Sequence, residues 1–234
     1  MNTQSEPETN LKAAPFVLAS ALMSYPRDNM SENVQMLLAD SDVEMPEDLR
    51  ALVTNKISPE NIQDLQSEYI SIFDNGRDAN PIYETEYDRR RAMAKGNELS
   101  DIAGFYHAFG FELDSSAEGM EMLDHVGIEL EFYSLMLMKQ LHLTEAKDQQ
   151  GVDIVEDGRK KFLRAHLGRF VGAISRRPGV KNSEFYGQIF NWGARLVEAE
   201  CNRLELTVEP ADWLDSEVVK EEDMNCSTVG SCPK

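Results

Sequence analysis

The sequence has few cysteines, no long apolar run and no N-terminal segment of the kind that directs export. Its longest apolar stretches, FYSLMLM and FVLASALM, are far shorter than the roughly 20 residues that a membrane-spanning helix needs. The N-terminal stretch MNTQSEPETNLKAAP is polar and acidic and lacks the basic and apolar regions of a signal peptide. Because the 3 cysteines are an odd number in such a chain, they favour reduced thiols over a disulfide framework. We therefore expect a cytoplasmic protein without stable membrane association.

Basic residues are also scarce. The chain has 23 lysines and arginines against 42 aspartates and glutamates, for a net charge of −19. This balance argues against a nucleic-acid-binding protein, whose affinity depends on neutralising phosphates with basic side chains. It would also repel an anionic membrane surface. A cationic partner, in contrast, would be attracted at long range, although acidity that serves only solubility is an equally good explanation of the charge.

The two ends of the chain differ in character from its centre. Cys226 and Cys232 lie in the stretch NCSTVGSCPK, which has no histidine and lacks the close cysteine spacing of a zinc site. The stretch from residue 207 onward is acidic and has no apolar stripe, so we expect a flexible tail. The predicted organisation is a flexible N-terminus (1–14), one compact helical domain (15–206) and a mostly disordered acidic tail (207–234).

Apolar residues recur at helical spacing through most of the central region, and no alternation of period two extends beyond a few residues. We expect Ser31 to cap one helix, and Ser58 to cap another that has Pro59 at its first position. Gly110 is expected to end a helix. The pattern predicts an all-α protein with helices over residues 15–25, 31–39, 58–74, 85–95, 97–109, 123–143, 156–177 and 183–206, and a short turn (RPGVKNS) before the last of these.

The predicted helix over residues 123–143 is apolar on most sides, yet it opens with polar side chains. Asp124 and His125 stand at its head, and Glu129 and Glu131 follow within two turns. A metal site, a catalytic cluster, structural hydrogen bonds and a recognition pocket are four explanations for this pattern. In the structural one, the helix dipole favours Asp124, and His125 is a core histidine with satisfied hydrogen bonds.

The metal and catalytic explanations find little support in the sequence. A di-iron helical bundle needs Glu-x-x-His on two helices, whereas Met122 occupies the position three residues before His125. Asp124 and His125 are neighbours, and neighbours in a helix point about 100° apart, which prevents the hydrogen bond of a catalytic relay. There is no Gly-x-Ser-x-Gly motif and no glycine-rich phosphate loop. We expect neither an enzyme nor a bound metal or cofactor.

Four segments resemble one family of proteins. DHVGIELEF (124–132) resembles the Asp-His-x-x-x-Glu-Leu-x-Phe signature of the TorD/DmsD/NarJ family, cytoplasmic chaperones that mature molybdenum-containing redox enzymes. EYISIFDNGRDANPIYETEY is similar to the family's helix that is followed by a proline and a Tyr-Glu-x-x-Tyr-like segment. DIAGFYHAFGFEL resembles its Tyr-x-x-x-Gly helix end, and FLRAHLGRFVGAI its His-Leu helix, with Phe170 at an aromatic position. Together these segments span about residues 15–200 in the expected order.

The resemblance implies an all-helical fold of the TorD-like type and a chaperone with no reaction of its own. Such a protein binds the N-terminal leader and the apo form of the catalytic subunit of a molybdenum-containing oxidoreductase. It holds this client until the cofactor is inserted, and so prevents premature export during the maturation of enzymes of anaerobic respiration. The implied peptide-binding residues are Asp124, His125 and Glu129, with Pro81, Tyr83, Glu84 and Tyr87 opposite them.

The residue types at these positions suit such a ligand. Carboxylates pair with arginine, and tyrosine rings stack on guanidinium planes, as a twin-arginine leader would require. The segment NPIYETEY lacks the tryptophan of some members, so the sequence is compatible with leaders that have the arginine pair and with leaders that lack it. The sequence is also compatible with either a monomeric or a dimeric chaperone. Two rival readings are a metal-binding protein or enzyme that uses Asp124, His125 and Glu129, and a helical adaptor that binds a basic protein by charge alone.

Overall fold

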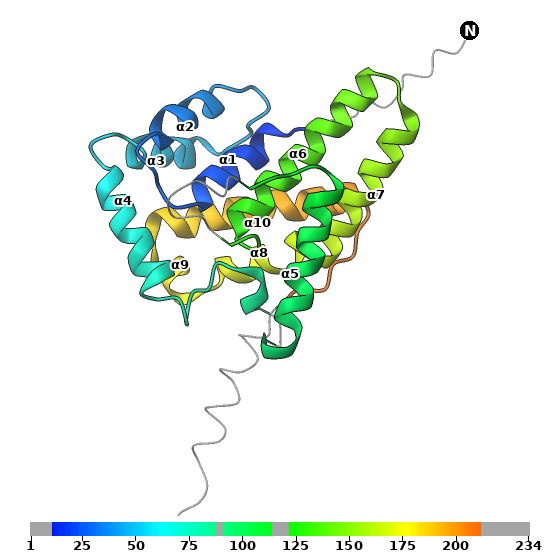
Figure 1. Cartoon of the computed structure of the whole chain (residues 1–234). Coiled ribbons are helices and arrows are strands. Elements are labelled where there is room, and N and C mark those ends of the chain that lie inside the picture. Colours follow the sequence, from blue (N-terminus) through cyan, green and yellow to red (C-terminus); the bar gives the residue numbers. More distant parts are fainter. Residues whose placement is uncertain (1–10, 88–90, 114–121, 212–234) are drawn as a thin grey trace, which may run out of the picture.

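The structure, a computed structural model, describes residues 11–87, 91–113 and 122–211. These residues form helices and connecting loops, with no β-strand among them, which confirms the all-α prediction (Figure 1). The helices are α1 (Ala14–Met23), α2 (Met30–Leu38), α3 (Glu47–Lys56), α4 (Ile62–Tyr69), α5 (Arg91–Ala108), α6 (Val126–Glu145), α7 (Gln149–Ala165), α8 (Leu167–Ser175), α9 (Pro178–Asn182) and α10 (Glu184–Arg203), with a π-helical turn η1 (Ile70–Asp74) and a 3-10 turn η2 (Glu84–Glu86).

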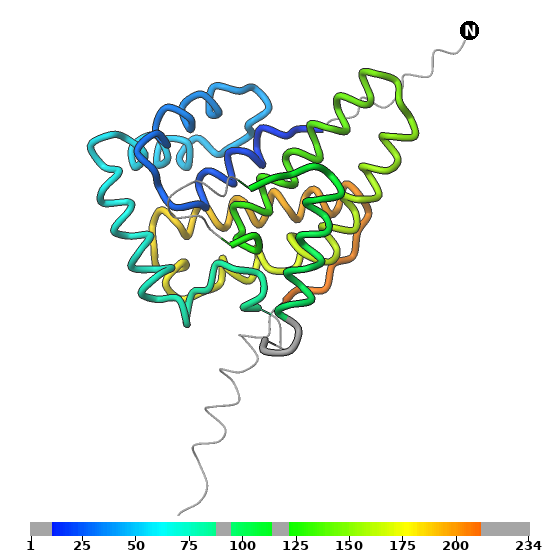
Figure 2. Tube along the Cα trace, viewed as in Figure 1, coloured from blue at the N-terminus to red at the C-terminus, as the bar shows by residue number. Residues whose placement is uncertain are grey.

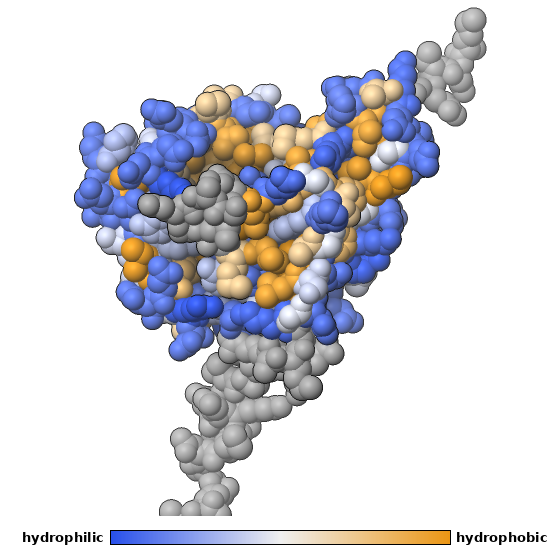
Figure 3. All heavy atoms as spheres, in the orientation of Figure 1, coloured by the Kyte–Doolittle hydropathy of each residue, from blue (hydrophilic) through white to orange (hydrophobic). Residues whose placement is uncertain are grey.

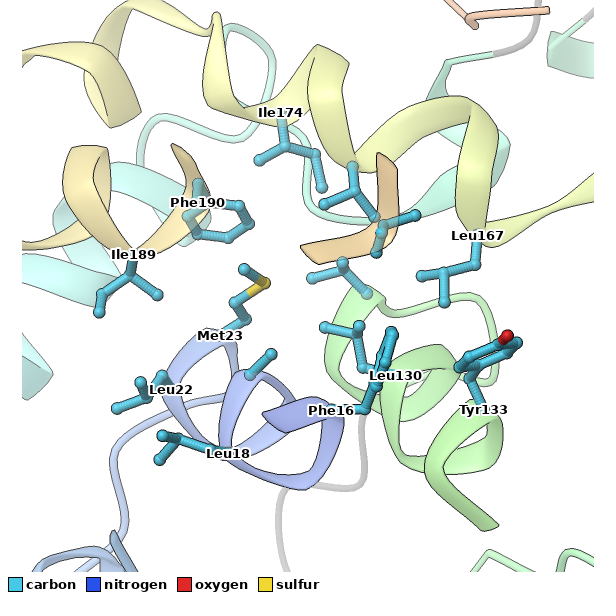
Figure 4. Packing of buried hydrophobic residues seen from close by; sticks show 14 of the residues in the cluster. Phe16, Leu18, Leu22, Met23, Leu130, Tyr133, Leu167, Ile174, Ile189 and Phe190 are labelled. Atoms are coloured by element: carbon cyan, nitrogen blue, oxygen red, sulfur yellow. The ribbon is translucent and has the colours of Figure 1, made fainter. Parts of the chain in front are cut away.

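The core lies where α1, α6, α8 and α10 meet. Helix α1 packs on both α6 and α10, and α8 closes the other side (Figure 4). The side chains that interdigitate there are almost all fully buried, and each contributes roughly 1.5–3 kcal/mol by leaving water: Phe16, Leu18, Leu22, Met23, Leu130, Tyr133, Leu167, Ile174, Ile189 and Phe190. The crossing of α1 and α10 is close at Gly193, where an added Cβ would lie 2.1 Å from Met23 Cε.

The outer helices are arranged around this centre. In the tube view, α2 and α3 lie at one end of the molecule, and the paired α6 and α7 project at the other (Figure 2). Within the described part of the chain, no helix combines the length and apolarity needed to cross a bilayer. Leu11 is buried just before α1, and Ala211 is buried at the end of the described chain, where its N–H donates to Arg169 O at 2.9 Å. Most of the predicted tail, with Cys226 and Cys232, lies outside the described residues.

Both predicted serine caps are wrong, because tertiary contacts decide these helix starts. Helix α2 begins after Asn29, and the Ser31 hydroxyl donates instead to the carbonyl of Ile57, 3.1 Å away at the end of α3. Helix α4 begins only at Ile62, because residues 58–61 form a turn in which Asn61 N–H donates to Ser58 O at 3.0 Å. Pro59 lies within this turn and not at a helical N1 position. Helix α3 was not among the predicted elements.

Three other boundaries differ from the prediction. Helix α5 is continuous through Gly96, because a helical glycine costs only about 1 kcal/mol and does not interrupt hydrogen bonding. Gly110, with φ of +64°, follows its end as expected. The predicted helix over 156–177 is two helices, α7 and α8, separated at His166, whose φ and ψ of −128° and −101° are not helical. The RPGVKNS turn contains the short helix α9.

Candidate peptide-binding site

The two segments singled out in the sequence lie against each other. Tyr83 and His125 form an isolated antiparallel bridge. Around it, Glu84 N–H donates to Asp124 O at 2.9 Å, and Val126 N–H donates to Ile82 O at 3.2 Å. These backbone hydrogen bonds fix the loop before α5 against the start of α6, although the segments are far apart in the sequence. The structure thus brings the predicted site residues together.

The sequence pattern predicts that His125 lies inside the helix. In the structure, His125 is instead the N-cap residue of α6 and precedes its first helical residue. Its Nδ1 accepts the N–H of Gly127 at 3.0 Å, and its Nε2 lies 3.1 Å from Tyr69 Oη. Because Nδ1 accepts, the ring proton is on Nε2, which donates to the Tyr69 hydroxyl. The side chain is 0% exposed, and burial lowers the pKa of His125 to about 3. His125 is therefore a neutral cap at physiological pH.

Asp124 also precedes the helix, and it anchors the opposing loop. Its Oδ2 accepts the Thr85 hydroxyl at 2.6 Å and the Thr85 N–H at 3.3 Å. Its Oδ1 is buried without a hydrogen-bond partner among the described residues. The aspartate therefore holds η2 in place, a role beyond the favourable interaction with a helix dipole that the sequence suggested.

A histidine that the sequence reasoning did not assign to the site completes the loop's attachment. His166, at the break between α7 and α8, places Nδ1 3.0 Å from Glu84 Oε2 and Nε2 3.1 Å from Asp101 Oδ2. Burial alone would lower the pKa of His166, but the hydrogen bonds and charges of Glu84 and Asp101 outweigh burial and raise it. The pair of carboxylates favours an imidazolium there. The available signal was the family-like segment FLRAHLGRF, which contains this histidine.

Glu129 lies in the first turn of α6 and is completely buried. Neither of its carboxyl oxygens accepts a hydrogen bond from a donor group within the described parts of the chain, but a protonated Glu129 can share a hydrogen bond with the Glu84 carboxyl. Burial, followed by the nearby carboxylates of Glu84 and Asp124, raises the pKa of Glu129 well above its ordinary value. The surroundings of Glu129 thus disfavour the charged form of its carboxyl group.

Tyr83 is the one member of the predicted set that reaches the surface. It is half-buried, its ring packs edge-on against His125 with centroids 5.4 Å apart, and the guanidinium carbon of Arg77 lies 5.4 Å from its centroid. Tyr87 is buried, and its hydroxyl donates to the buried Pro81 carbonyl at 2.6 Å. The acids therefore lie beneath a surface at which Tyr83 and its neighbour Glu86 are accessible.

Two cavities of the molecule lie away from this site. One, of about 360 Å³, lies between α8, α10 and the chain from Leu206 to Pro210, and another, of about 370 Å³, lies beside Met138 and Leu143 of α6. None of the seven predicted residues lines either cavity. Over residues 11–87, 91–113 and 122–211, no three His, Cys, Asp or Glu side chains are placed to hold a metal ion.

The matched sequence region covers this whole arrangement. A family model described as nitrate reductase delta subunit matches residues 38–176, which is more than half of the chain. The chain belongs to this family. Its members are chaperones for the maturation of molybdoenzymes, as the resemblance to the TorD/DmsD/NarJ proteins implied. A comparison with curated proteins found no match to the sequence. The family match runs from the end of α2 to the end of α8 and so includes η2, the start of α6 and His166.

The buried acid of this chaperone predicts an unusual response of stability to pH. Folded Glu129 keeps its proton at pH values where the unfolded chain has lost it, so the contribution of Glu129 to stability declines as pH rises above about 4.5. Glu129→Gln cannot titrate. In urea unfolding at a series of pH values from 5 upward, we expect the free energy of unfolding of the variant to rise relative to that of the wild type, by at most about 1.4 kcal/mol per pH unit, until the pH reaches the folded pKa of Glu129. Glu145→Gln, at an exposed position of the same helix, should show no gain. Parallel curves for Glu129→Gln and wild type would exclude a protonated Glu129.

Proposed function

We propose that the chain is a cytoplasmic chaperone that binds the N-terminal leader and apo form of the catalytic subunit of a molybdoenzyme. In this role it supports insertion of the molybdenum cofactor and prevents premature export, and it catalyses no reaction itself. Membership of the nitrate reductase delta subunit family supports a molybdoenzyme as the client. The observation that carries the choice of site is the backbone pairing of the Tyr83 loop with the head of α6.

The seven predicted residues take different parts in this proposal. Tyr83 contacts the leader, because its side chain is the accessible one. The other six residues are buried beneath Tyr83, and their part is to hold its loop in position. They are Pro81, Glu84, Tyr87, Asp124, His125 and Glu129. The buried carboxylates also make the potential beneath Tyr83 negative, which favours a cationic segment at the surface. A leader with arginines would use the ring face for cation–π contact.

One face of the molecule also carries surface that suits the apolar part of a leader. On the face viewed in Figure 1, apolar residues gather in several places between the α2–α3 end and the α6–α7 end of the molecule (Figure 3). A leader that combines a cationic part with an apolar segment would use such apolar surface together with the contact at Tyr83. Apolar burial should let binding survive moderate salt, which weakens contacts between exposed charges.

The test is affinity capture of the client from the host grown under anaerobic respiration. We expect the tagged wild-type chain to recover a molybdoenzyme catalytic subunit. Tyr83→Ala should reduce this recovery about tenfold, because truncation of a central aromatic contact typically costs 1–2 kcal/mol of binding or more. Met36→Ala, which removes an exposed apolar side chain from α2, serves as the control and should bind like the wild type.

Two results would contradict the proposal. One is recovery of no molybdoenzyme subunit by a folded wild-type chain. The other is recovery that Tyr83→Ala leaves intact and that moderate salt abolishes, which would instead indicate an adaptor that binds by charge alone. Unfolding midpoints of both variants should be measured alongside, so that lost binding is not confused with a lost fold.

A further inference from the structure

The cavity of about 360 Å³ beside α8 and α10 is enclosed by well-anchored elements. Helices α8 and α10 form two of its walls, and the chain after α10 (orange in Figure 1) forms a third. That chain is held at both ends, because Leu206 N–H donates to Cys201 O and Ala211 N–H donates to Arg169 O, each at 2.9 Å. The volume lies within the range of small-molecule sites in proteins. The cavity is therefore large enough, and its walls are fixed enough, to hold a small ligand.

Much of the cavity lining is apolar. Val171, Val197 and Cys201 are buried side chains that contribute to it, and Leu206 and Val208 are half-buried ones. The Cys201 thiol is free, and burial raises its pKa to about 11, so it is a neutral part of this wall at physiological pH. Such a wall suits the apolar body of a ligand, which gains by leaving water.

Positive charge lines the α8 side of the cavity, although the net charge of the chain is −19. Arg169 and Arg176 lie about two helical turns apart on α8, and Glu198 lines the cavity from α10. Arg169 is half-buried, and it donates to backbone carbonyls only, from Nε to Glu209 O and from Nη1 to Ala165 O, both at the long distance of 3.4 Å. No carboxylate of a described residue pairs with it. An anion in the cavity would offer Arg169 shorter, charge-assisted hydrogen bonds.

We propose that this cavity is a binding site for a small organic carboxylate with an apolar body. The carboxylate pairs with Arg169, and the apolar body lies against the wall that includes Val197 and Cys201. The site is separate from the proposed leader-binding site at Tyr83, which lines no part of it. Helix α10 and the chain after it also lie outside residues 38–176, the region that matches the family. The inference therefore concerns a second site and does not depend on the proposed function.

Gly172 of α8 offers a way to fill the cavity without disturbing the fold. An added Cβ there would meet only Arg176 Nη1, 3.8 Å away, which is ordinary van der Waals contact. A leucine at this position therefore takes up space that the ligand needs. Gly104 of α5 is a matched control, because it is also a helical glycine, an added Cβ has nothing within 4 Å, and it does not line the cavity. Both substitutions replace glycine by a better helix former.

The experiment titrates the full chain with 3-phenylpropionate and follows the chemical shifts of the Val171 and Val197 methyl groups. For a ligand of this size we expect a dissociation constant of about 1 mM. Neutral 3-phenylpropan-1-ol and cationic 3-phenylpropylamine have the same apolar body and should bind about tenfold more weakly or less. Gly172→Leu should weaken binding of 3-phenylpropionate at least tenfold, whereas Gly104→Leu should bind like the wild type.

A second pair of variants tests the charge. Arg169→Gln should bind 3-phenylpropionate about tenfold more weakly and leave the affinity for 3-phenylpropan-1-ol unchanged, because only the carboxylate loses its partner. Arg195→Gln, at an exposed position of α10, changes the net charge equally and should leave both affinities unchanged. Circular dichroism of each variant establishes that the fold is retained.

Three results would overturn the carboxylate site, whatever the client capture shows. One is the absence of shifts at Val171 and Val197 when 3-phenylpropionate is well above the expected dissociation constant. The second is equal affinity for the three probes, and the third is binding that Gly172→Leu leaves intact. If Arg169→Gln loses its fold, the three probes and the two glycine variants still decide the question. The expected pattern, together with no recovery of a molybdoenzyme subunit, would support this site and contradict only the proposed function.

Discussion

Acidification below pH 6.5 should remove the contribution of His125 to stability, by about 1.4 kcal/mol per pH unit. The unfolded histidine takes up a proton near its ordinary pKa of 6.5, whereas burial lowers the folded pKa to about 3. Unfolding therefore binds a proton throughout this window, so the contribution of His125 to stability is present above pH 6.5 and is lost as pH falls toward 3. Down to pH 4 the loss from this one residue is about 3 kcal/mol.

Urea unfolding of His125→Asn at a series of pH values measures this contribution. Asparagine can still cap α6, but it does not titrate. At pH 7 the variant should be about 1–2 kcal/mol less stable, because the hydrogen bond to Tyr69 is lost. This deficit should shrink and then reverse as pH falls. His142→Asn, at an exposed position near the end of α6, is the control and should follow the wild type. A deficit that is constant with pH would show that the pKa of His125 is the same in the folded and unfolded chain, and would contradict a buried neutral histidine.

Removal of Arg159 should cost about 3–5 kcal/mol, the range for breaking a buried ion pair. Arg159 is 0% exposed and pairs with Glu200, and its Nη2 and Nε donate to Tyr133 Oη at 3.0 and 3.2 Å. The group joins α6, α7 and α10, because Gln140 also accepts from Arg159. Arg159→Ala leaves Glu200 paired only with the partly exposed Arg203, whose Nε lies 2.8 Å from Glu200 Oε2. In a chain of this length, the unfolding midpoint should fall by about 10 °C.

The expected pattern distinguishes a broken pair from lost packing. Arg159→Met with Glu200→Leu, which replaces both charges by apolar side chains, should recover most of the loss. Lys161→Ala, which removes the exposed pair with Asp157 on the same helix, should change stability by less than about 0.5 kcal/mol. Thermal unfolding of the three variants is the measurement. A double variant as unstable as Arg159→Ala would show that the shape of the arginine, and not its charge balance, is what matters.

Apolar periodicity carried most of the fold prediction. The apolar residues of α1, α6 and α10 can be recognised in the sequence because these helices form the core. In the core, burial of apolar side chains is the main contribution to the free energy of folding. The family resemblance predicted which segments form the site, which periodicity alone could not do. It placed the Tyr83 loop opposite Asp124 and His125, a contact between distant segments that local patterns do not encode, and the structure has that contact.

The errors share a physical cause, which is that tertiary partners override local signals. Ser31 looked like a cap, but it bonds across to Ile57 in the neighbouring helix. The break at His166 cannot be read locally, because the histidine is held by Glu84 and Asp101 from other elements. Burial was the other unpredicted quantity. A recognition pocket was one of the four explanations for the polar residues at this helix head, and the sequence did not predict that Asp124, His125 and Glu129 would all be 0% exposed.

The central claim is that a molybdoenzyme leader binds at Tyr83, and site-specific photo-crosslinking tests it most directly. The photoreactive p-benzoyl-phenylalanine replaces Tyr83 in the full chain, and Met36 in a control. Each chain is irradiated in the host during anaerobic respiration, and the cross-linked peptides are identified by mass spectrometry. We expect position 83 to cross-link to the N-terminal leader of a molybdoenzyme catalytic subunit, and position 36 not to. Cross-links from position 83 that map elsewhere in the client, or that match those from position 36, would contradict leader binding at this site.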